Sequence, residues 1–453
     1  MAKIFISFLG TNPYLHCKYE LSKKNISEPV RYVQEALASS ICKKWNKDDK
    51  FLVFATEGEN GSIKRNWEKG SVSSFDSKGQ DFEKEPTGLE TRLKRLSLDC
   101  HIDMIPISDG TQDGEIWSII NAIIQNIPEK SELYFDITHS FRYIPMIIPS
   151  IISFLKTTKE TKLKSIYYGA FEVLGSNKDV CSIEIENRVA PIRELKELYN
   201  MIEWSEAVNS FIKFGDERNL IDEIDTIDNS TLDKKLKGQL QTTKSNIKKL
   251  GTALRFNDVS GLSKIQNVKI STRINLDNNP ELLALKEIST KIEKHLSIWS
   301  KDEVKNGFLA SKWCLDNHRF AQSLTFAQES AIGYYYNIFE WNKKEFDSID
   351  KKDRRGAVTF ILKIKSKQKD PKTKEVYTKN DFRHSSQNVI DWFNKSADSA
   401  LEKLNNDELV NDFFKLEKWR NMVNHTKQGD RKNMQEEFPN ILNKFIDILI
   451  KEE

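Results

Sequence analysis

Near the C-terminus, the segment "EKWRNMVNHTKQGD" (Glu417–Asp430) contains three polar residues that could do chemistry together: Arg420, Asn421 and His425. An imidazole has a pKa near neutrality and exchanges protons at physiological pH, whereas a guanidinium keeps its positive charge. These groups suit RNA cleavage without a metal, because RNA supplies its own nucleophile, the 2′-hydroxyl. His425 would act as the general acid or base, and Arg420 would stabilise the charge of the transition state.

The spacing of this pair favours a helix end. Five positions on a continuous helix separate the side chains by roughly 140°, unlike metal-binding histidines four residues apart. We therefore expect Arg420 in the last turns and His425 where the helix ends before Gly429. One histidine cannot easily serve both sides of the phosphorus, so a two-fold dimer would supply a second pair. The alternative is a surface arginine and a histidine that only interacts with the helix dipole.

A second polar cluster, "DITHSFR" (Asp136–Arg142), follows an apolar run and precedes a helical one. It offers two hydroxyls, an imidazole and a guanidinium beside a helix N-terminus: Thr138, His139, Ser140 and Arg142. Free backbone N–H groups and an arginine suit a phosphate-rich anion. The alternative is that Thr138 or Ser140 only caps the helix and Arg142 lies at the surface. For the cluster as a whole, we favour a ligand site.

Gly10 and Thr11 follow the first apolar run and could bring the backbone close to a ligand, although a single glycine there also suits an ordinary turn. No apolar run is followed by G-x-G-x-x-G or by the P-loop pattern. An ordinary dinucleotide or triphosphate site is therefore disfavoured.

The elements that would position these residues differ between the two halves of the chain. In the first half, short apolar runs alternate with helical patterns, which predicts a parallel, doubly wound α/β sheet with ligands at the carboxyl ends of its strands. The predicted strands are Lys3–Thr11, Lys50–Gly58, Asp103–Ser108, Glu132–Ser140 and Lys164–Glu172, and the predicted helices include Val30–Trp45, Gly114–Gln125 and Phe141–Lys156. The stretch Glu57–Pro86 is rich in Gly, Ser and charge and is expected to be a surface insertion.

From about Arg193, helical periodicity dominates. The clearest stretches are Leu195–Gly215, Pro280–Trp299, Phe320–Phe339 and Phe438–Ile450. Strands are expected to return briefly in Val268–Leu276. The segment Lys343–Arg383 is strongly basic; it could line an RNA channel, but we favour a solvated loop.

Composition bounds the class of protein. The 453 residues are 38% hydrophobic and 30% charged with a net charge of +3, which indicates a globular protein whose basic sites must be local. Five cysteines without a C-x-x-C pair are expected to be reduced. The longest apolar run, Tyr143–Leu155, is too short for a membrane span, and no signal peptide is recognisable. We therefore expect a cytoplasmic protein without membrane contact.

Several motifs together resemble those of the CARF–HEPN ribonucleases, ancillary effectors of type III CRISPR systems. They occur in the expected order and span nearly the whole chain: "FLGTNPY", "DITHSFR", "YYGAFE", "WCLDNHRFAQSLTFAQES" and "RNMVNH". The resemblance implies an α/β Rossmann-like CARF domain over residues 1–190 and an all-α domain containing HEPN over residues 191–453, with an insertion at about 343–383.

By this resemblance, the CARF domain would bind a cyclic oligoadenylate across a dimer interface. The first loop would contribute Gly10, Thr11 and Asn12, and the fourth would contribute Thr138, His139, Ser140 and Arg142. Arg420 and His425 match the HEPN pattern R-x4-6-H, and Asn421 holds its frequent polar position.

The implied activity is a cyclic-oligoadenylate-activated, metal-independent endoribonuclease that cuts single-stranded RNA in antiviral defence. A homodimer or a higher oligomer is expected, no cofactor is needed, and cyclic tetra-adenylate is the favoured activator, with the six-membered ring as the alternative. Two other functions stay open: a non-enzymatic nucleotide sensor that signals to a partner, and a HEPN-type RNase toxin with a different trigger. An intact Arg420 and His425 speak against the sensor.

Overall fold

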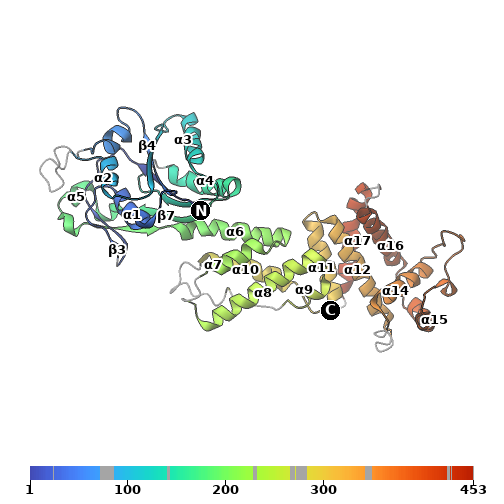
Figure 1. Cartoon of the computed structure of the whole chain (residues 1–453). Helices are drawn as coiled ribbons and strands as arrows, with labels where there is room; N and C mark the ends of the chain where they lie inside the picture. The colour runs from blue at the N-terminus through green and yellow to red at the C-terminus, as the bar shows by residue number, and fades with distance from the viewer. Residues whose placement is uncertain are drawn as a thin grey trace. The chain divides into compact units, whose positions relative to one another are not determined.

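The computed structural model describes residues 1–23, 25–71, 86–139, 143–227, 232–265, 271, 283–341, 349–425, 429 and 431–451. The chain divides into two compact units, Met1–Met201 and Ile202–Glu453, which are described separately (Figure 1). No helix in these described ranges combines the length and the apolar character that crossing a membrane requires.

The first unit is built on an eight-stranded sheet with the order β3-β2-β8-β7-β6-β1-β4-β5. Five adjacent strands run parallel to one another, from the centre to one edge of the sheet: β1 (Lys3–Leu9), β4 (Lys50–Thr56), β5 (His101–Ile107), β6 (Glu132–Asp136) and β7 (Lys162–Gly169). These are the five strands that the apolar runs predict, and the prediction is confirmed.

The other edge of the sheet differs from the prediction. It contains β2 (Lys18–Ser22), β3 (Asn25–Ile26) and β8 (Val189–Glu194). β8 runs antiparallel to β7 and parallel to β2, and β2 runs antiparallel to β3. The sheet is therefore mixed, and the expectation of a wholly parallel sheet was wrong at this edge, where the strands are short and partly charged.

Helices cover both faces of the sheet (Figure 1). Phe5 on β1 packs into one core with α1 (Val33–Ile41) and α2 (Leu89–Arg95), whereas Ile4 and Ile6 pack into the other. Because successive side chains of a strand point to opposite faces, a continuous apolar strand serves both cores. The second core holds α3 (Asp113–Asn126) and α4 (Ile144–Lys159), and the unit is completed by η1 (Cys42–Lys44), η2 (Ile63–Trp67), η3 (Phe171–Leu174), α5 (Asn177–Cys181) and η4 (Ile185–Asn187).

The stretch expected to be a surface insertion is partly integrated into this unit. Asn66 and Trp67 on η2 are buried. Residues 72–85 lie outside the described ranges. The prediction of a surface insertion holds for the exposed residues 57–60 but was wrong for η2, which packs against the α1 and α2 side of the sheet.

In its described ranges, the second unit is helix-rich. Its elements are α6 (Lys196–Phe214, which begins in the first unit), α7 (Arg218–Thr226), α8 (Lys234–Phe256), α9 (Val259–Leu262), α10 (Leu283–Ser297), α11 (Glu303–Asp316), α12 (Phe320–Phe339), α14 (Lys351–Lys365), η8 (Lys379–Asp381), α15 (Gln387–Glu402), α16 (Asp407–Asn424) and α17 (Arg431–Lys451). Helices α6 to α11 share one hydrophobic core, and α12 to α17 share another, to which Phe308 of α11 also contributes.

Two sequence expectations fall in this unit. The predicted strand Val268–Leu276 lies outside the described residues except for Ser271. Within the basic segment, the prediction of a solvated loop was wrong for α14, because Ala357, Val358 and Ile361 are fully buried in the core. The apolar residues recur at helical spacing and bury one face of a helix whose other face is basic.

Candidate ligand-binding and catalytic sites

A cavity of about 360 Å³ lies at the carboxyl ends of β1, β4, β5 and β6. It is lined by residues from two loops that the sequence singles out: Gly10, Thr11, Asn12, Thr138 and His139. Among the parallel strands, β4 and β5 lie on one side of β1, whereas β6 and β7 lie on the other. This is a topological switch point, where open α/β sheets bind ligands.

The loop after β1 is held by side chains from outside it. The backbone N–H of Gly10 donates to the Tyr14 hydroxyl at 2.9 Å. The side-chain amide of the buried Asn66 donates to the carbonyl oxygens of Gly10 at 2.8 Å and of Asn12 at 3.0 Å. The Asn66 carbonyl in turn accepts from the Ser71 hydroxyl at 2.8 Å. The loop is therefore fixed in shape without any ligand.

The turn after β6 is organised around a buried carboxylate. Asp136 accepts from the Ser7 hydroxyl at 2.7 Å, and from the backbone N–H and the hydroxyl of Thr138 at 3.0 and 2.6 Å. Burial raises the pKa of Asp136, and the hydrogen bonds from Thr138 and Ser7 act in the opposite direction. The Thr138 oxygen also accepts from the backbone N–H of Gly169 at 2.8 Å. The Thr138 hydroxyl is thus already hydrogen-bonded within the protein, and it connects the end of β6 to the end of β7.

His139 presents a neutral imidazole to this cavity. Its ring meets the Tyr14 ring edge-on, with 4.5 Å between the centroids. Burial lowers the pKa of His139 to about 3, so the ring is uncharged at neutral pH. Its Nε2 atom is enclosed and has no hydrogen-bond partner within the described part of the chain. His139 therefore lines the cavity without contributing a positive charge.

Ser140 and Arg142, the other two predicted ligand residues, lie outside the described residues. Their roles stay predictions. The sequence does not predict a role for Asn66, because this residue belongs to no recognisable motif. Tyr14 could have been predicted to contact this loop, since it is the last residue of the "FLGTNPY" motif.

In the second unit, the predicted catalytic residues lie at the end of α16. The helix ends at Asn424, Arg420 lies in its last turns, and His425 is the residue that follows the helix. This local arrangement is the one that the spacing predicts. His425 is exposed, and its backbone N–H donates to the carbonyl oxygen of Asn421 at 3.1 Å.

Asn421 contacts both members of the pair. Its side-chain oxygen accepts from Nη1 of the half-buried Arg420 at 3.1 Å, and its backbone carbonyl holds the N–H of His425. The Nε atom of Arg420 is enclosed without a hydrogen-bond partner in the described ranges. The helix end thus carries a partly satisfied cation beside an exposed imidazole. No group of three or more His, Cys, Asp or Glu side chains that could hold a metal ion occurs among the described residues.

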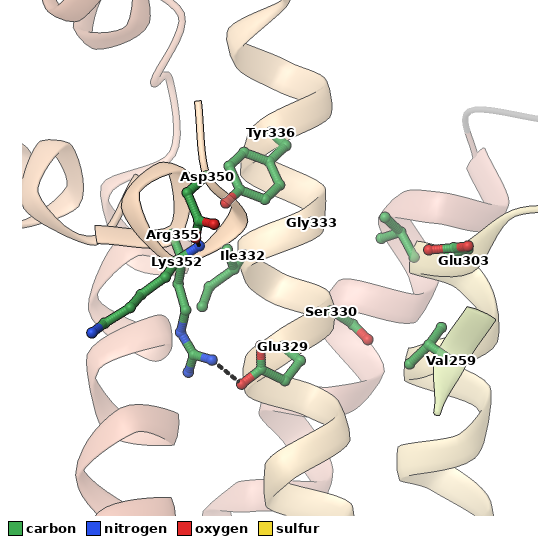
Figure 2. Close-up of a pocket in the computed structure, with 11 residues that line it drawn as sticks. Val259, Glu303, Glu329, Ser330, Ile332, Gly333, Tyr336, Asp350, Lys352 and Arg355 are labelled. Atoms are coloured by element: carbon green, nitrogen blue, oxygen red, sulfur yellow. Dashed lines mark hydrogen bonds and ion pairs between the residues drawn. The ribbon is translucent and has the colours of Figure 1, made fainter. Parts of the chain in front are cut away.

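A larger cavity, of about 650 Å³, lies elsewhere in the second unit, where α9, α11, α12 and the start of α14 contribute lining residues (Figure 2). Figure 2 shows Arg355 reaching across to Glu329, and the two form an ion pair of 2.5 Å. Asp350 accepts from the backbone N–H of Lys352 at 2.8 Å and so caps α14. The cavity is lined by three acidic and two basic side chains, and none of the three predicted catalytic residues lines it.

Comparisons with known proteins bear mainly on the first unit. Residues 4–172 match the family model of the CARF domain of the CRISPR system endoribonuclease Csx1. The match covers the five parallel strands and both loops of the cavity. The chain is also 25% identical over 254 residues to the CRISPR-associated protein MJ1674 of Methanocaldococcus jannaschii. That alignment covers 48% of this chain and 37% of the relative, so the chain spans little more than a third of the relative's length. Residues 4–172 of the first unit thus form a CARF domain, and the chain is similar over about half of its length to a CRISPR-associated protein.

Proposed function

We propose that this protein is a metal-independent, single-strand endoribonuclease that a cyclic oligoadenylate activates in type III CRISPR antiviral defence. The observation that carries the proposal is the cavity at the carboxyl edge of the CARF sheet, lined by Gly10, Thr11, Asn12, Thr138 and His139. The matched model supports it, because its description names an endoribonuclease.

The size of the cavity fits one part of a large ligand. Its volume of about 360 Å³ is near the lower end of the roughly 300–1,000 Å³ typical of ligand sites. A ring of several adenylates needs more room, and a two-fold dimer would place two such cavities against one ring. Backbone groups of the first loop and the neutral imidazole of His139 would bind nucleotide groups by hydrogen bonds. The predicted Arg142 would supply charge for the phosphates.

The chemistry proposed for the second unit needs no cofactor. The 2′-hydroxyl of the RNA attacks the adjacent phosphorus, the bond from phosphorus to the 5′-oxygen breaks, and a 2′,3′-cyclic phosphate and a 5′-hydroxyl result. The exposed His425 of one subunit would accept the proton of the 2′-hydroxyl, and that of the partner would protonate the leaving 5′-oxygen. Arg420, held by Asn421, would stabilise the phosphorane. The second unit would thus form the HEPN domain of a homodimer, and a larger assembly is compatible with this site.

Activation would be a population shift. A saturating ring that binds the active arrangement more tightly than the inactive one multiplies the ratio of active to inactive molecules by the ratio of its two affinities. Cyclic tetra-adenylate is the proposed activator, and the six-membered ring is the alternative.

The test is cleavage of fluorescent single-stranded RNA in EDTA, with cyclic tri-, tetra- and hexa-adenylates compared. We expect one ring to switch cleavage on, and His425→Ala to abolish it. Equal cleavage without any ring would indicate a toxin with another trigger. Tight ring binding without cleavage would indicate a sensor that signals to a partner.

A further inference from the structure

Helix α8 concentrates positive charge in a chain that is nearly neutral. Over Lys234–Phe256 it carries six lysines and one arginine but no acidic residue, whereas the net charge of the whole chain is only +3. The helix begins at the N-cap Asp233, whose carboxylate accepts from two backbone N–H groups, and its apolar residues face the core at helical spacing. The basic residues are therefore left on the outer face.

A groove of about 560 Å³ follows this outer face toward α9. Four lysines line it: Lys244, Lys248, Lys249 and Lys264. The first three belong to α8, and Lys264 follows α9, so cations approach the groove from both walls. One carboxylate, that of Asp258, also lines it.

Most of this charge is not neutralised within the protein. Lys244 forms an ion pair with Asp225. Lys248 and Lys264 are exposed, and neither forms an ion pair with any residue that the structure describes. These two lysines therefore keep their charge available for an anionic ligand.

A second hollow beside α8 differs from this groove, because its cations form contacts within the protein. This hollow, of about 440 Å³, is also lined by cations, but each of them is already engaged. Arg218 pairs with Asp216 at 2.7 Å, and Arg255 pairs with Glu217. Arg319 donates to a backbone carbonyl and lies over an aromatic ring. The cations of this second hollow are therefore all engaged within the protein, whereas Lys248 and Lys264 of the first groove are not engaged in ion pairs with the described residues.

Neutral hydrogen-bonding side chains alternate with the lysines along the groove. Gln241, Ser245, Lys248 and Thr252 follow the spacing of one helical face, at about 1.5 Å per residue. From Gln241 to Thr252 this gives a track of roughly 16 Å. Lysines attract phosphates without regard to sequence, and neutral side chains bond to phosphate and sugar oxygens.

We propose that the groove between α8 and α9 binds the phosphate backbone of the single-stranded RNA substrate, a proposal that rests on the ribonuclease function above. A hollowed, lysine-lined track without a large apolar side chain fits an extended polyanion. The groove belongs to the α6–α11 core and α16 to the other. The proposal therefore places a contact with the RNA backbone apart from Arg420 and His425.

The test measures binding alone, with the full-length protein and a fluorescent 2′-O-methyl RNA that cannot be cleaved by 2′-hydroxyl attack. Fluorescence anisotropy gives the affinity between about 50 and 200 mM salt. The double variant Lys248→Gln/Lys264→Gln should bind about ten-fold more weakly, with a salt slope smaller by roughly 1.4, because two phosphate contacts are lost. The matched control is Lys372→Gln/Lys374→Gln, which removes two exposed lysines from the basic segment at 343–383.

Unchanged binding in the groove variant overturns the proposal. An equal loss in the control also overturns it, because binding then responds only to net charge. Displacement of the RNA by polyglutamate of matched charge at equal concentration would overturn it in favour of an acidic protein partner. If the wild-type protein binds RNA through the groove but never cleaves it, the proposed activity fails while the groove assignment stands.

Discussion

The side-chain amide of Asn66 lies 2.8 Å from the carbonyl oxygen of Gly10, and the two residues are 56 positions apart in the sequence. The same amide bonds to the carbonyl of Asn12, so one buried side chain holds two points of the first loop. A loop held in this way loses less conformational entropy when it meets a ligand than a free loop would. The pre-formed shape of the CARF cavity therefore depends on a residue outside the two loops that line it.

Replacing Asn66 with alanine should weaken the binding of cyclic tetra-adenylate. Two carbonyl groups lose their donor, which costs about 1–3 kcal/mol when such groups are buried. We expect a lower free energy of unfolding in urea and a higher dissociation constant by calorimetry. The matched control is Asn60→Ala, because Asn60 is an exposed asparagine of the same segment. Identical ring binding in both variants would show that Asn66 does not shape the site.

His139 should make the stability of the protein fall in mild acid. Its folded pKa is about 3, against an ordinary value near 6.5. Between these two pH values the unfolded chain binds a proton that the folded chain does not. The free energy of unfolding is therefore unaffected by His139 above about pH 6.5 and decreases as the pH falls below it. His139→Gln should flatten this decline in urea unfolding measured between about pH 7 and 5.

A second buried histidine, His295, provides a control for the acid sensitivity assigned to His139. Burial also lowers the pKa of His295, to about 4, and this residue belongs to the second unit. His295→Gln should therefore remove its own share of the acid sensitivity and leave that of His139. If His139→Gln keeps the full wild-type decline, the ring is charged in the folded protein.

Asp136 should affect the pH dependence of stability in the opposite direction to His139. Burial raises its folded pKa, so its carboxyl favours folding at low pH, and this contribution is lost as the pH rises through the folded pKa. Asp136→Asn keeps an oxygen for Thr138 and an amide that can donate to Ser7. The variant should gain stability relative to the wild type as the pH increases from about 4 to 8 in urea titrations. A difference that stays constant over this range would contradict the raised pKa.

The parallel strands and the end of α16 could be predicted because their signals are local. Apolar runs such as Lys50–Thr56 are buried on both faces, and a helix end near Gly429 is marked by residue type and spacing. The cavity could be predicted as well, since the carboxyl ends of parallel strands meet at one edge. Its residues Gly10 and Thr138 come together for this reason.

The remaining features depend on distant contacts. The strand β2, "KYELS", has no apolar run and is held by pairing with β8, more than 160 residues later in the chain. Asn66 is explained only by the carbonyls it meets. Helix α14 was not predicted because its sequence is rich in lysine and arginine, although its buried residues have ordinary helical spacing. Composition alone indicates a loop there, whereas periodicity indicates a helix.

His425→Ala should abolish RNA cleavage while leaving ring binding intact. Loss of a general acid–base group typically lowers the rate by about 10²–10⁴-fold. The rate of ring-activated cleavage in EDTA measures this effect, and calorimetry with cyclic tetra-adenylate checks the first unit. EDTA itself should not change the wild-type rate. Cleavage by the variant at the wild-type rate would place the reaction elsewhere in the chain.

Asn421 is expected to act as a positioning residue through Arg420. Its side-chain oxygen accepts from the Arg420 guanidinium, so Asn421→Ala frees the cation to move. We expect a cleavage rate lower by about ten-fold, less than for His425→Ala, because the charge remains but its geometry is lost. Asn421→Asp keeps an oxygen acceptor at the same place and should restore most of the rate. The pH profile of cleavage should be unchanged in Asn421→Ala, because this substitution leaves the His425 imidazole in place. If Asn421→Asp is as slow as Asn421→Ala, the bond to Arg420 is not what the asparagine contributes.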